Sequence, residues 1–133
     1  MERVQITVDA IAKYENGIVI IDRKRTPFGL AMPGGKLDKK ETLENAMHRE
    51  LFEETGLKIS KLEQFRTYSE PDRDTRGDYR WISTVFICEA YGKLNPGSDA
   101  KGARIIQLNE IDSLKEKFAF DHYKILSDYK NSI

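Results

Sequence analysis

The order of apolar and polar positions along the chain predicts a mixture of strands and helices. Apolar and polar residues alternate over positions 4–8, which is typical of a strand with one buried face. The pair Asn16-Gly17 favours a hairpin turn, and the apolar run 18–21 follows it as a second strand. Two strands are therefore expected before the glycine-rich segment that begins near residue 33.

The next segment predicts a helix that starts at Thr42 and ends at Gly56. The Thr42 hydroxyl can cap the first turn, and Met47 and Leu51, four residues apart, supply an apolar stripe that packs inward. Gly56 can take the left-handed conformation that ends many helices.

The second half of the chain continues with strands and short helices. Its apolar, β-branched and aromatic runs predict strands over 62–68, 81–91 and 103–108 and helices over 109–115 and 121–129, the last capped by Asp121. No linker, repeat or low-complexity tract interrupts the pattern. We expect one mixed α/β (α+β) domain over residues 1–133.

Three glutamates on the central helix are candidates for metal chemistry. Glu50, Glu53 and Glu54 are spaced i, i+3 and i+4, so on a helix their carboxylates leave one face. Such a cluster suits Mg²⁺ or Mn²⁺, which usually bind together with substrate phosphates. The alternative is a solvated acidic face with an Arg49–Glu53 pair, but this would not need glycines on both sides of the helix.

A proline and two glycines precede that helix. We expect Pro33, Gly34 and Gly35 to form a tight turn that lets the backbone approach a ligand closely. A carbonyl in this turn would be a further metal ligand.

The whole segment resembles the Nudix box: Gly, five residues, Glu, seven residues, Arg-Glu, an aliphatic residue, any residue, Glu-Glu, any residue, Gly and an aliphatic residue. Every spacing is intact, at Gly35, Glu41, Arg49, Glu50, Leu51, Glu53, Glu54, Gly56 and Leu57. The order of elements is also similar to the Nudix fold, a mixed β-sheet sandwiched between α-helices, so the resemblance covers nearly the whole chain.

The resemblance implies metal-dependent hydrolysis of a nucleoside diphosphate linked to another group. It implies that Glu50 and Glu54 are the principal metal ligands, and that Glu53 is a further ligand or a base that orients water. Arg49 would hold the glutamates in place. The remaining implied contacts are Glu41 as a supporting acid, the Gly34 carbonyl on the metal and Gly35 against the substrate, with Mg²⁺ as the cofactor and Mn²⁺ as its alternative.

The segment 68–77 carries the substrate hypothesis. It resembles the corresponding loop of ADP-ribose pyrophosphatases, in which a proline such as Pro71, fifteen residues after Gly56, is typical. Arg73 and Arg76 could fork onto phosphate or ribose oxygens. The alternative is that each arginine forms a salt bridge that fixes the loop.

Aromatic side chains are candidates for stacking on a base. We favour Phe28, just before the glycine turn, over Tyr79 and Trp81, for which core or interface packing is the alternative. Related enzymes often carry a glutamate base where this chain has Gly102, which leaves Glu53, Asp99 or another group as the base.

Composition limits the partners. The 22 basic and 22 acidic residues cancel, so we expect a small-molecule nucleotide substrate and neither nucleic acid nor an anionic membrane as partner. The apolar runs are too short for a membrane span and the first residues lack a signal-peptide pattern, which predicts a cytoplasmic protein. Related ADP-ribose enzymes are commonly homodimers, and we expect the same here. Cys88 is expected to be buried, and His48 and His122 to be surface or capping residues.

Three functions stay open at this point. The first is an ADP-ribose pyrophosphatase that forms AMP and ribose 5-phosphate. The second is a nucleoside triphosphate pyrophosphohydrolase, which the box permits equally. The third is a sensor that binds an ADP-ribose-like ligand without catalysis.

Overall fold

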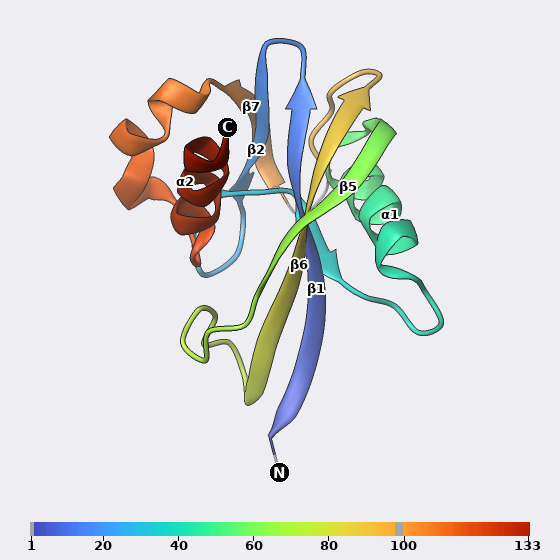
Figure 1. Cartoon of the computed structure of the whole chain (residues 1–133), viewed down its shortest axis with the longest axis vertical. Coiled ribbons are helices and arrows are strands. Elements are labelled where there is room, and N and C mark those ends of the chain that lie inside the picture. The colour runs from blue at the N-terminus through green and yellow to red at the C-terminus, as the bar shows by residue number, and fades with distance from the viewer. Residues whose placement is uncertain (1, 98–99) are drawn as a thin grey trace.

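The computed structural model describes residues 2–97 and 100–133, and a mixed β-sheet forms its centre. Two long strands, β1 (Arg3–Tyr14) and β6 (Tyr79–Tyr91), run parallel along most of their length (Figure 1). Each carries a continuous buried segment, as expected for strands that are covered on both faces.

The other strands extend this pair in both directions. In the described residues the order is β3-β2-β1-β6-β5, with β4 also paired to β1 and β7 to β2. The bounds are β2 (Gly17–Arg23), β3 (Gly29–Ala31), β4 (Gly34–Lys36), β5 (Lys58–Tyr68) and β7 (Ala100–Ile106). The predicted strands are confirmed, whereas the three-residue strands β3 and β4 are too short to give a periodic signal. Asp99, a candidate base, lies outside the described residues.

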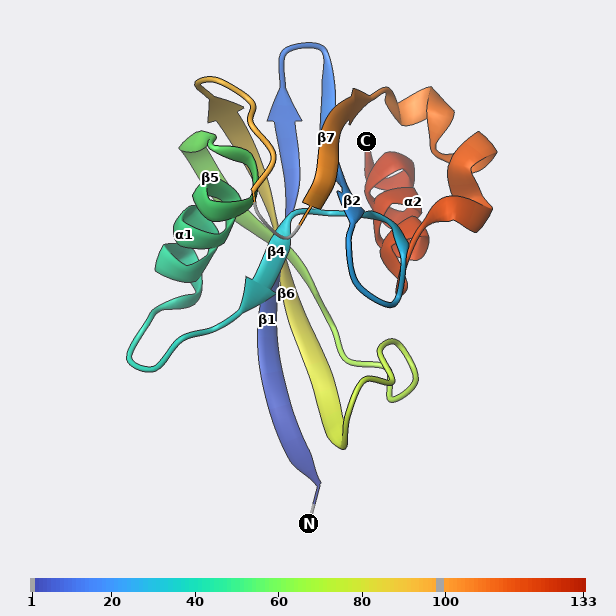
Figure 2. The same cartoon turned by 180° about the vertical axis from the view of Figure 1, so that it is seen from behind.

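Helices cover the two faces of the sheet, which confirms the predicted sandwich. On one face Met47 and Leu51 of α1 (Leu43–Thr55) pack against Ala10 and Ala12 of β1. On the other face the apolar side of α2 (His122–Ser132) packs against Ile11. Alternate residues of β1 therefore supply the two cores, and Figure 2 shows the helices on either side of the strands.

Helix α1 begins and ends as its sequence predicts. The Thr42 hydroxyl accepts a hydrogen bond from the Asn45 backbone N–H at 3.1 Å, and Gly56 takes a φ of 76°. The Gly56 N–H donates to the Phe52 carbonyl at 2.8 Å. Met47 and Leu51 are fully buried, and Glu50 and Glu54 lie on the helix beside this apolar stripe.

The expected tight turn at the two glycines is wrong. Only Pro33 lies in a bend, and Gly34 and Gly35 belong to strand β4, which pairs with Val8 and Asp9 of β1. A Cβ on Gly34 would collide with the Val8 carbonyl and the Asp9 carboxylate. The missing side chain therefore allows close strand pairing instead of a turn.

The predicted helix 109–115 is also different in the structure. Two short 3₁₀ segments, η1 (Leu108–Glu110) and η2 (Asp112–Lys117), flank the fully buried Ile111. At α2 the side chain of Asp121 makes no capping hydrogen bond, because its carboxylate binds Arg73 instead. Asp121 is therefore the N-cap residue of α2 by position, as predicted, but its side chain does not cap the helix.

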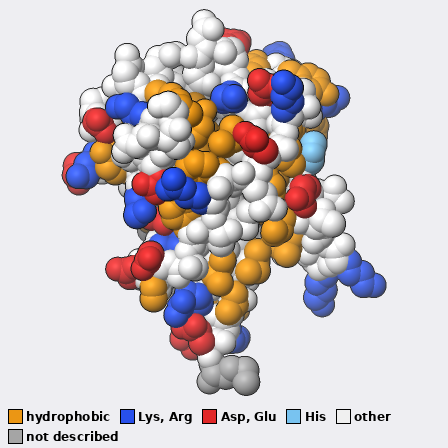
Figure 3. Space-filling view, in the orientation of Figure 1, with side chains coloured by type: hydrophobic (Ala, Val, Ile, Leu, Met, Phe, Trp, Pro, Cys, Tyr) orange, Lys and Arg blue, Asp and Glu red, His pale blue; other side chains and the backbone are white. Residues whose placement is uncertain are grey.

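The distribution of charge on the surface and the burial of the single cysteine are as the sequence led us to expect. Basic and acidic side chains are interspersed over the face in Figure 3. No helix in the described ranges is long and apolar enough to cross a membrane. Cys88 is buried as predicted, and burial raises the pKa of its thiol to about 12.

Candidate active site

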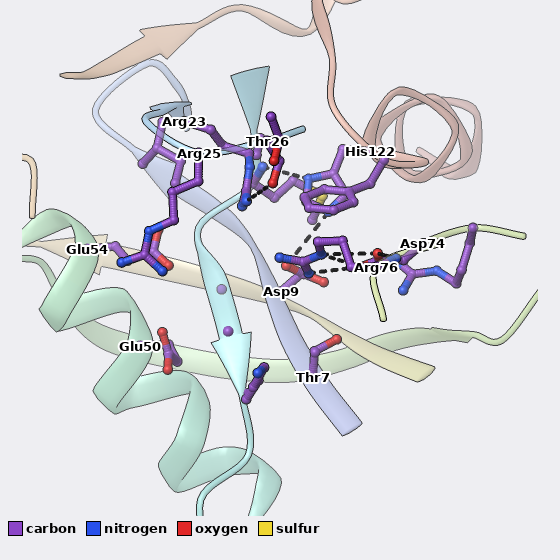
Figure 4. A pocket seen from close by; sticks show the side chains of 18 of the residues that line it. Thr7, Asp9, Arg23, Arg25, Thr26, Glu50, Glu54, Asp74, Arg76 and His122 are labelled. Carbon is purple, nitrogen blue, oxygen red and sulfur yellow. Dashed lines mark hydrogen bonds and ion pairs between the residues drawn. The ribbon is translucent and has the colours of Figure 1, made fainter. Parts of the chain in front are cut away.

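A cavity of about 400 Å³ lies where β1, β4, α1, the 70–77 loop and the start of α2 meet (Figure 4). Carboxylates of α1 and β1 and guanidinium groups from two loops and the end of β2 line it. Its charged lining residues are Asp9, Arg23, Arg25, Lys36, Asp38, Glu50, Glu54, Arg73, Asp74 and Arg76. The cavity therefore holds both signs of charge, as a site for a metal and a phosphate requires.

Glu50 and Glu54 form the acidic wall. Burial is the main reason that the pKa of Glu54 rises to about 8, and the charges of Glu50 and then Asp9 raise it further. Burial also raises the pKa of Glu50, although Arg49 opposes the shift. The Glu54 Oε2 atom is buried and has no hydrogen-bond partner. Two carboxylates whose charged forms are disfavoured, with one orphaned oxygen, are the surroundings that a cation would stabilise.

Strand β4 lies directly against these carboxylates. A Cβ on Gly35 would collide with the carboxylate of Glu50, so a larger residue would displace it. A backbone hydrogen bond from Gly34 favours the ionised form of Glu54. Both glycines line the cavity, in agreement with their expected place beside the site.

The guanidinium of Arg49 binds two of the acidic residues, Glu41 and Glu50. Its Nε and Nη2 donate to Glu41 at 2.7 and 2.9 Å, and its Nη1 donates to Glu50 at 2.7 Å. A further bond from Nη2 reaches the Lys36 carbonyl at 3.0 Å. These contacts raise the pKa of Arg49, and they lower the pKa of Glu41 to about 2, chiefly through the hydrogen bond between the two side chains.

Glu53 stands apart from the other two glutamates. Its side chain is 56% exposed and does not line the cavity, and its Oε2 lies 3.3 Å from Arg49 Nη1. Within the described part of the chain, no three His, Cys, Asp or Glu side chains are grouped closely enough to hold an ion by themselves. A hard cation fits the oxygen donors of Glu50 and Glu54 if water, backbone or substrate oxygens complete its shell.

The two arginines of the substrate loop have different surroundings. Arg73 is buried and makes a bidentate ion pair with Asp121, in which its Nε and Nη2 donate to the two carboxylate oxygens at 2.9 and 2.8 Å. Arg76 is 41% exposed, and its Nη2 donates to Asp74 at 2.8 Å. Both line the cavity and both are paired with a carboxylate, but the guanidinium of Arg73 is buried whereas that of Arg76 is partly exposed.

The aromatic candidates lie outside the lining. Phe28 is 60% exposed, with the Lys101 ammonium over its ring at 5.3 Å. Trp81 is buried, and its indole N–H donates to the Arg76 carbonyl at 2.7 Å, which matches the packing alternative. Tyr79 packs edge-on against Trp81.

His122 is neither the surface residue nor the capping residue that we expected. It is buried in the cavity wall, where its Nδ1 accepts a hydrogen bond from the Met32 N–H at 2.9 Å. Burial lowers its pKa, so the ring is neutral near pH 7. Its Nε2 lies 3.8 Å from Asp9 Oδ1, while Ser83 donates to Asp9 Oδ2 at 2.6 Å. His48, by contrast, is exposed.

Sequence reasoning missed Asp9, Arg23 and Arg25 as parts of the site. One signal was present for Asp9, because it is a lone charge between the apolar residues Val8 and Ala10 of a strand. Arg23 ends β2 and Arg25 follows it, and only the folded chain shows that they line the same cavity as the glutamates of α1 (Figure 4).

The chain belongs to the NUDIX domain family, whose model matches residues 3–129, and the same family model and relatives identify it as a Nudix hydrolase. It is 44% identical over 127 residues to the ADP-ribose pyrophosphatase of Methanocaldococcus jannaschii, a match that covers 93% of this chain and 72% of the relative. It is also 31% identical over 118 residues to the 8-oxo-dGTP diphosphatase of Escherichia coli, covering 84% and 88% of the two chains.

Solved structures share the fold. A bifunctional NMN adenylyltransferase/ADP ribose pyrophosphatase from Francisella tularensis, complexed with AMP and a Mn ion, has a TM-score of 0.85 and 29% identity. The match covers 99% of this chain but only 42% of that longer protein. The NUDIX domain of Shewanella oneidensis NrtR, complexed with ADP ribose, also gives a TM-score of 0.85, at 23% identity and 99% and 90% coverage, and shows the fold alone.

Proposed function

We propose that this chain hydrolyses ADP-ribose to AMP and ribose 5-phosphate with Mg²⁺ as its cofactor and Mn²⁺ as the alternative. The observation that carries the proposal is the pair Glu50 and Glu54, with one orphaned carboxylate oxygen, in the same cavity as Arg23 and Arg76. A diphosphate is an anion that such a site can hold from both sides, by a cation on the carboxylates and by the guanidinium groups.

Each predicted residue receives a role from its position. Glu50 and Glu54, with the backbone of Gly34, would hold the cation, and Gly35 keeps the Glu50 carboxylate in place. When bound, a divalent cation neutralises diphosphate oxygens and lowers the pKa of a bound water. Arg49 fixes the direction of the Glu50 carboxylate. Glu53, which is exposed beside Arg49, remains our candidate for orienting water or for completing the metal shell.

We assign the substrate contacts by how exposed each candidate side chain is. Both Arg73 and Arg76 line the cavity and both are paired with a carboxylate. Arg76 is the better candidate for a phosphate contact because it is 41% exposed, whereas Arg73 is buried in its pair with Asp121. Phe28 remains a candidate for the base only if the substrate extends beyond the cavity lining.

The preference for ADP-ribose rests on the similarity to the M. jannaschii enzyme over most of both chains. The second candidate is hydrolysis of a nucleoside triphosphate, and the similarity to the E. coli 8-oxo-dGTP diphosphatase favours it. Both reactions would use the same carboxylates, so the products distinguish them.

Chromatography of the products separates the two candidates. The protein with Mg²⁺ is incubated in parallel with ADP-ribose and with 8-oxo-dGTP. We expect AMP and ribose 5-phosphate from the first, with kcat/KM above about 10⁴ M⁻¹s⁻¹, in the usual enzyme range. Turnover of the triphosphate alone would reject the substrate assignment and keep the site. Binding of ADP-ribose without turnover of either compound would favour a sensor.

The expected homodimer, the cytoplasmic location and the absence of nucleic-acid partners are also proposals. The equal numbers of acidic and basic residues support the last of these. Sedimentation equilibrium of the full chain tests the dimer, since a single species at the monomer mass would reject it.

A further inference from the structure

The ring of Phe120 is in contact with two of the arginines that line the cavity, Arg23 at the end of β2 and Arg76 in the 70–77 loop. The guanidinium carbons of Arg23 and Arg76 each lie over this ring, 4.7 Å from its centroid. Arg76 lies at the same distance over the ring of Trp81. Phe120 itself lines the cavity. One aromatic side chain therefore connects two cations that come from separate segments of the chain.

The backbone around Phe120 is held in an uncommon conformation. Its φ is 56°, in the left-handed region that residues with side chains rarely adopt. The Ala119 N–H donates to the Leu30 carbonyl at 2.8 Å, and the His122 N–H donates back to the Ala119 carbonyl at 3.3 Å. Such a conformation persists when its surroundings over-determine it, and it is found most often at functional sites.

The side chains that follow Phe120 fix the same turn from two more directions. The Asp121 carboxylate binds the buried Arg73 of the substrate loop, and the His122 ring accepts a hydrogen bond from Met32, beside β4. The turn is thus attached both to the substrate loop and to the segment that leads to the glycines. The position of the Phe120 ring relative to both walls of the cavity is set by these attachments.

The two guanidinium groups repel each other, and several contacts compensate for this. Burial lowers the pKa of Arg23 most, and the charge of Arg76 lowers it further. Arg23 donates to the Pro27 carbonyl at 2.7 Å, while Arg76 is held by Asp74. The face of the Phe120 ring attracts both cations, as an aromatic quadrupole does. Two cations held at a fixed separation, within electrostatic reach of Glu54, suit a ligand with two adjacent phosphates.

We propose that Phe120 is a positioning residue that holds Arg23 and Arg76 together so that both grip the diphosphate of the substrate. The proposal deepens the proposed function and rests on it for the identity of the substrate. Phe120 acts through the two arginines, and it does not touch the reacting atoms. Its effect should therefore fall on the binding of the diphosphate and much less on the chemical step.

The test compares three variants of the full chain. Phe120→Leu removes the ring, Phe120→Tyr keeps it, and Phe118→Leu is the matched control, because Phe118 packs on Tyr123 and lies outside the cavity lining. Calorimetry with inorganic pyrophosphate, in the presence of chelator, measures the dissociation constant without metal or turnover. Steady-state kinetics with ADP-ribose and Mg²⁺ gives KM and kcat separately.

We expect F120L to weaken pyrophosphate binding and to raise KM by about tenfold, in the range of two partly desolvated cation–π contacts, with kcat changed by less than about threefold. F120Y and F118L should bind pyrophosphate as the unaltered protein does. If F120L does not fold, Phe120→Met removes the ring with an unbranched side chain and serves the same comparison.

Unchanged pyrophosphate binding in F120L or F120M would overturn the proposal, and so would a loss confined to kcat. An equal loss in F120Y would also overturn it, since that variant keeps the ring. Failure of the proposed function has a different signature. The unaltered protein would then release no AMP from ADP-ribose, while the pyrophosphate measurements would still decide the role of Phe120.

Discussion

Arg49 binds both carboxylate oxygens of Glu41, through Nε at 2.7 Å and Nη2 at 2.9 Å. This pair joins the loop before α1 to the helix itself and leaves Nη1 of Arg49 for Glu50. The planar guanidinium can satisfy both glutamates at once, which an ammonium group cannot do with the same geometry. Glu41 therefore acts on the cavity through Arg49 and not by direct contact, because it is absent from the cavity lining.

Replacing Arg49 by lysine keeps the charge and removes the fork. We expect Arg49→Lys to lower kcat or the apparent affinity for Mg²⁺ by about 10–100-fold, as is usual when the partner of a metal ligand is lost. Activity measured against Mg²⁺ concentration checks this. Arg66→Lys is the control, since Arg66 is 52% exposed and 3.6 Å from Asp128, and it should behave as the unaltered protein. Equal behaviour of the two variants would contradict the role of Arg49.

The raised pKa of Glu54 predicts how stability depends on pH when no metal is present. Between the ordinary value of 4.5 and about 8, the folded protein keeps a proton on Glu54 that the unfolded chain releases. Its contribution to stability is therefore present below pH 4.5 and is lost as the pH rises to 8. Glu54→Gln lacks this term because its amide does not titrate.

Thermal unfolding in chelator measures that difference. The melting temperature of E54Q should rise relative to that of the unaltered protein between pH 5 and pH 8, because burial and the charge of Glu50 oppose ionisation of Glu54 over this interval. Adding Mg²⁺ at pH 8 should stabilise only the unaltered protein strongly. A constant difference across this pH range would show that Glu54 does not titrate as the structure indicates.

Arg73 and Arg76 should separate stability from substrate binding. Arg73→Gln leaves the Asp121 carboxylate without its partner, and breaking a buried ion pair costs about 3–5 kcal/mol of unfolding free energy. Arg76→Gln removes a guanidinium that is 41% exposed, although its partner Asp74 is buried, so we expect a raised KM for ADP-ribose and a smaller loss of stability than in R73Q. Denaturant unfolding and steady-state kinetics on both variants check the division. A stable R73Q protein with raised KM would instead make Arg73 a ligand contact.

A substitution at Phe28 tests whether the bound substrate extends beyond the cavity lining. A base stacked on its ring would be worth about 1–3 kcal/mol, or roughly 5–150-fold in KM. Because Phe28 is 60% exposed and outside the cavity lining, we expect Phe28→Ala to change KM by less than about twofold, which is below the lower limit of such stacking. Kinetics with ADP-ribose gives the answer, and a tenfold rise would place the base over Phe28.

The parts of the fold that depend on local pattern were predictable. Thr42, Gly56 and the Met47–Leu51 stripe fixed the position of α1, because caps and helical spacing are local properties. The short strand β4 was not predictable, since its pairing with Asp9 depends on contact between segments more than twenty residues apart. Gly34 and Gly35 predicted a turn, but in the structure they pair with β1 as part of strand β4.

The candidate site likewise has a part that the sequence predicts and a part that depends on the folded chain. The box placed Glu50 and Glu54 correctly on one helix face, but the helical spacing alone did not show that Glu53 turns toward Arg49 and away from the cavity. The wall of the cavity opposite the glutamates is built from three separate segments of the chain. The roles of Arg23 and His122 in that wall could therefore not be recognised from their neighbours in the sequence. Asp121 illustrates the limit, because a residue in a capping position serves a distant arginine instead.

The most direct test of the account is the rate of AMP formation from ADP-ribose as Mg²⁺ is added back to chelator-treated protein, for the unaltered chain and for E54Q. The account predicts activity that requires the cation and saturates with it, and a kcat for E54Q that is at least about 100-fold lower in a folded protein. Full activity in chelator, or near-normal activity of E54Q, would contradict the assignment of the cavity as a metal-dependent diphosphate hydrolase.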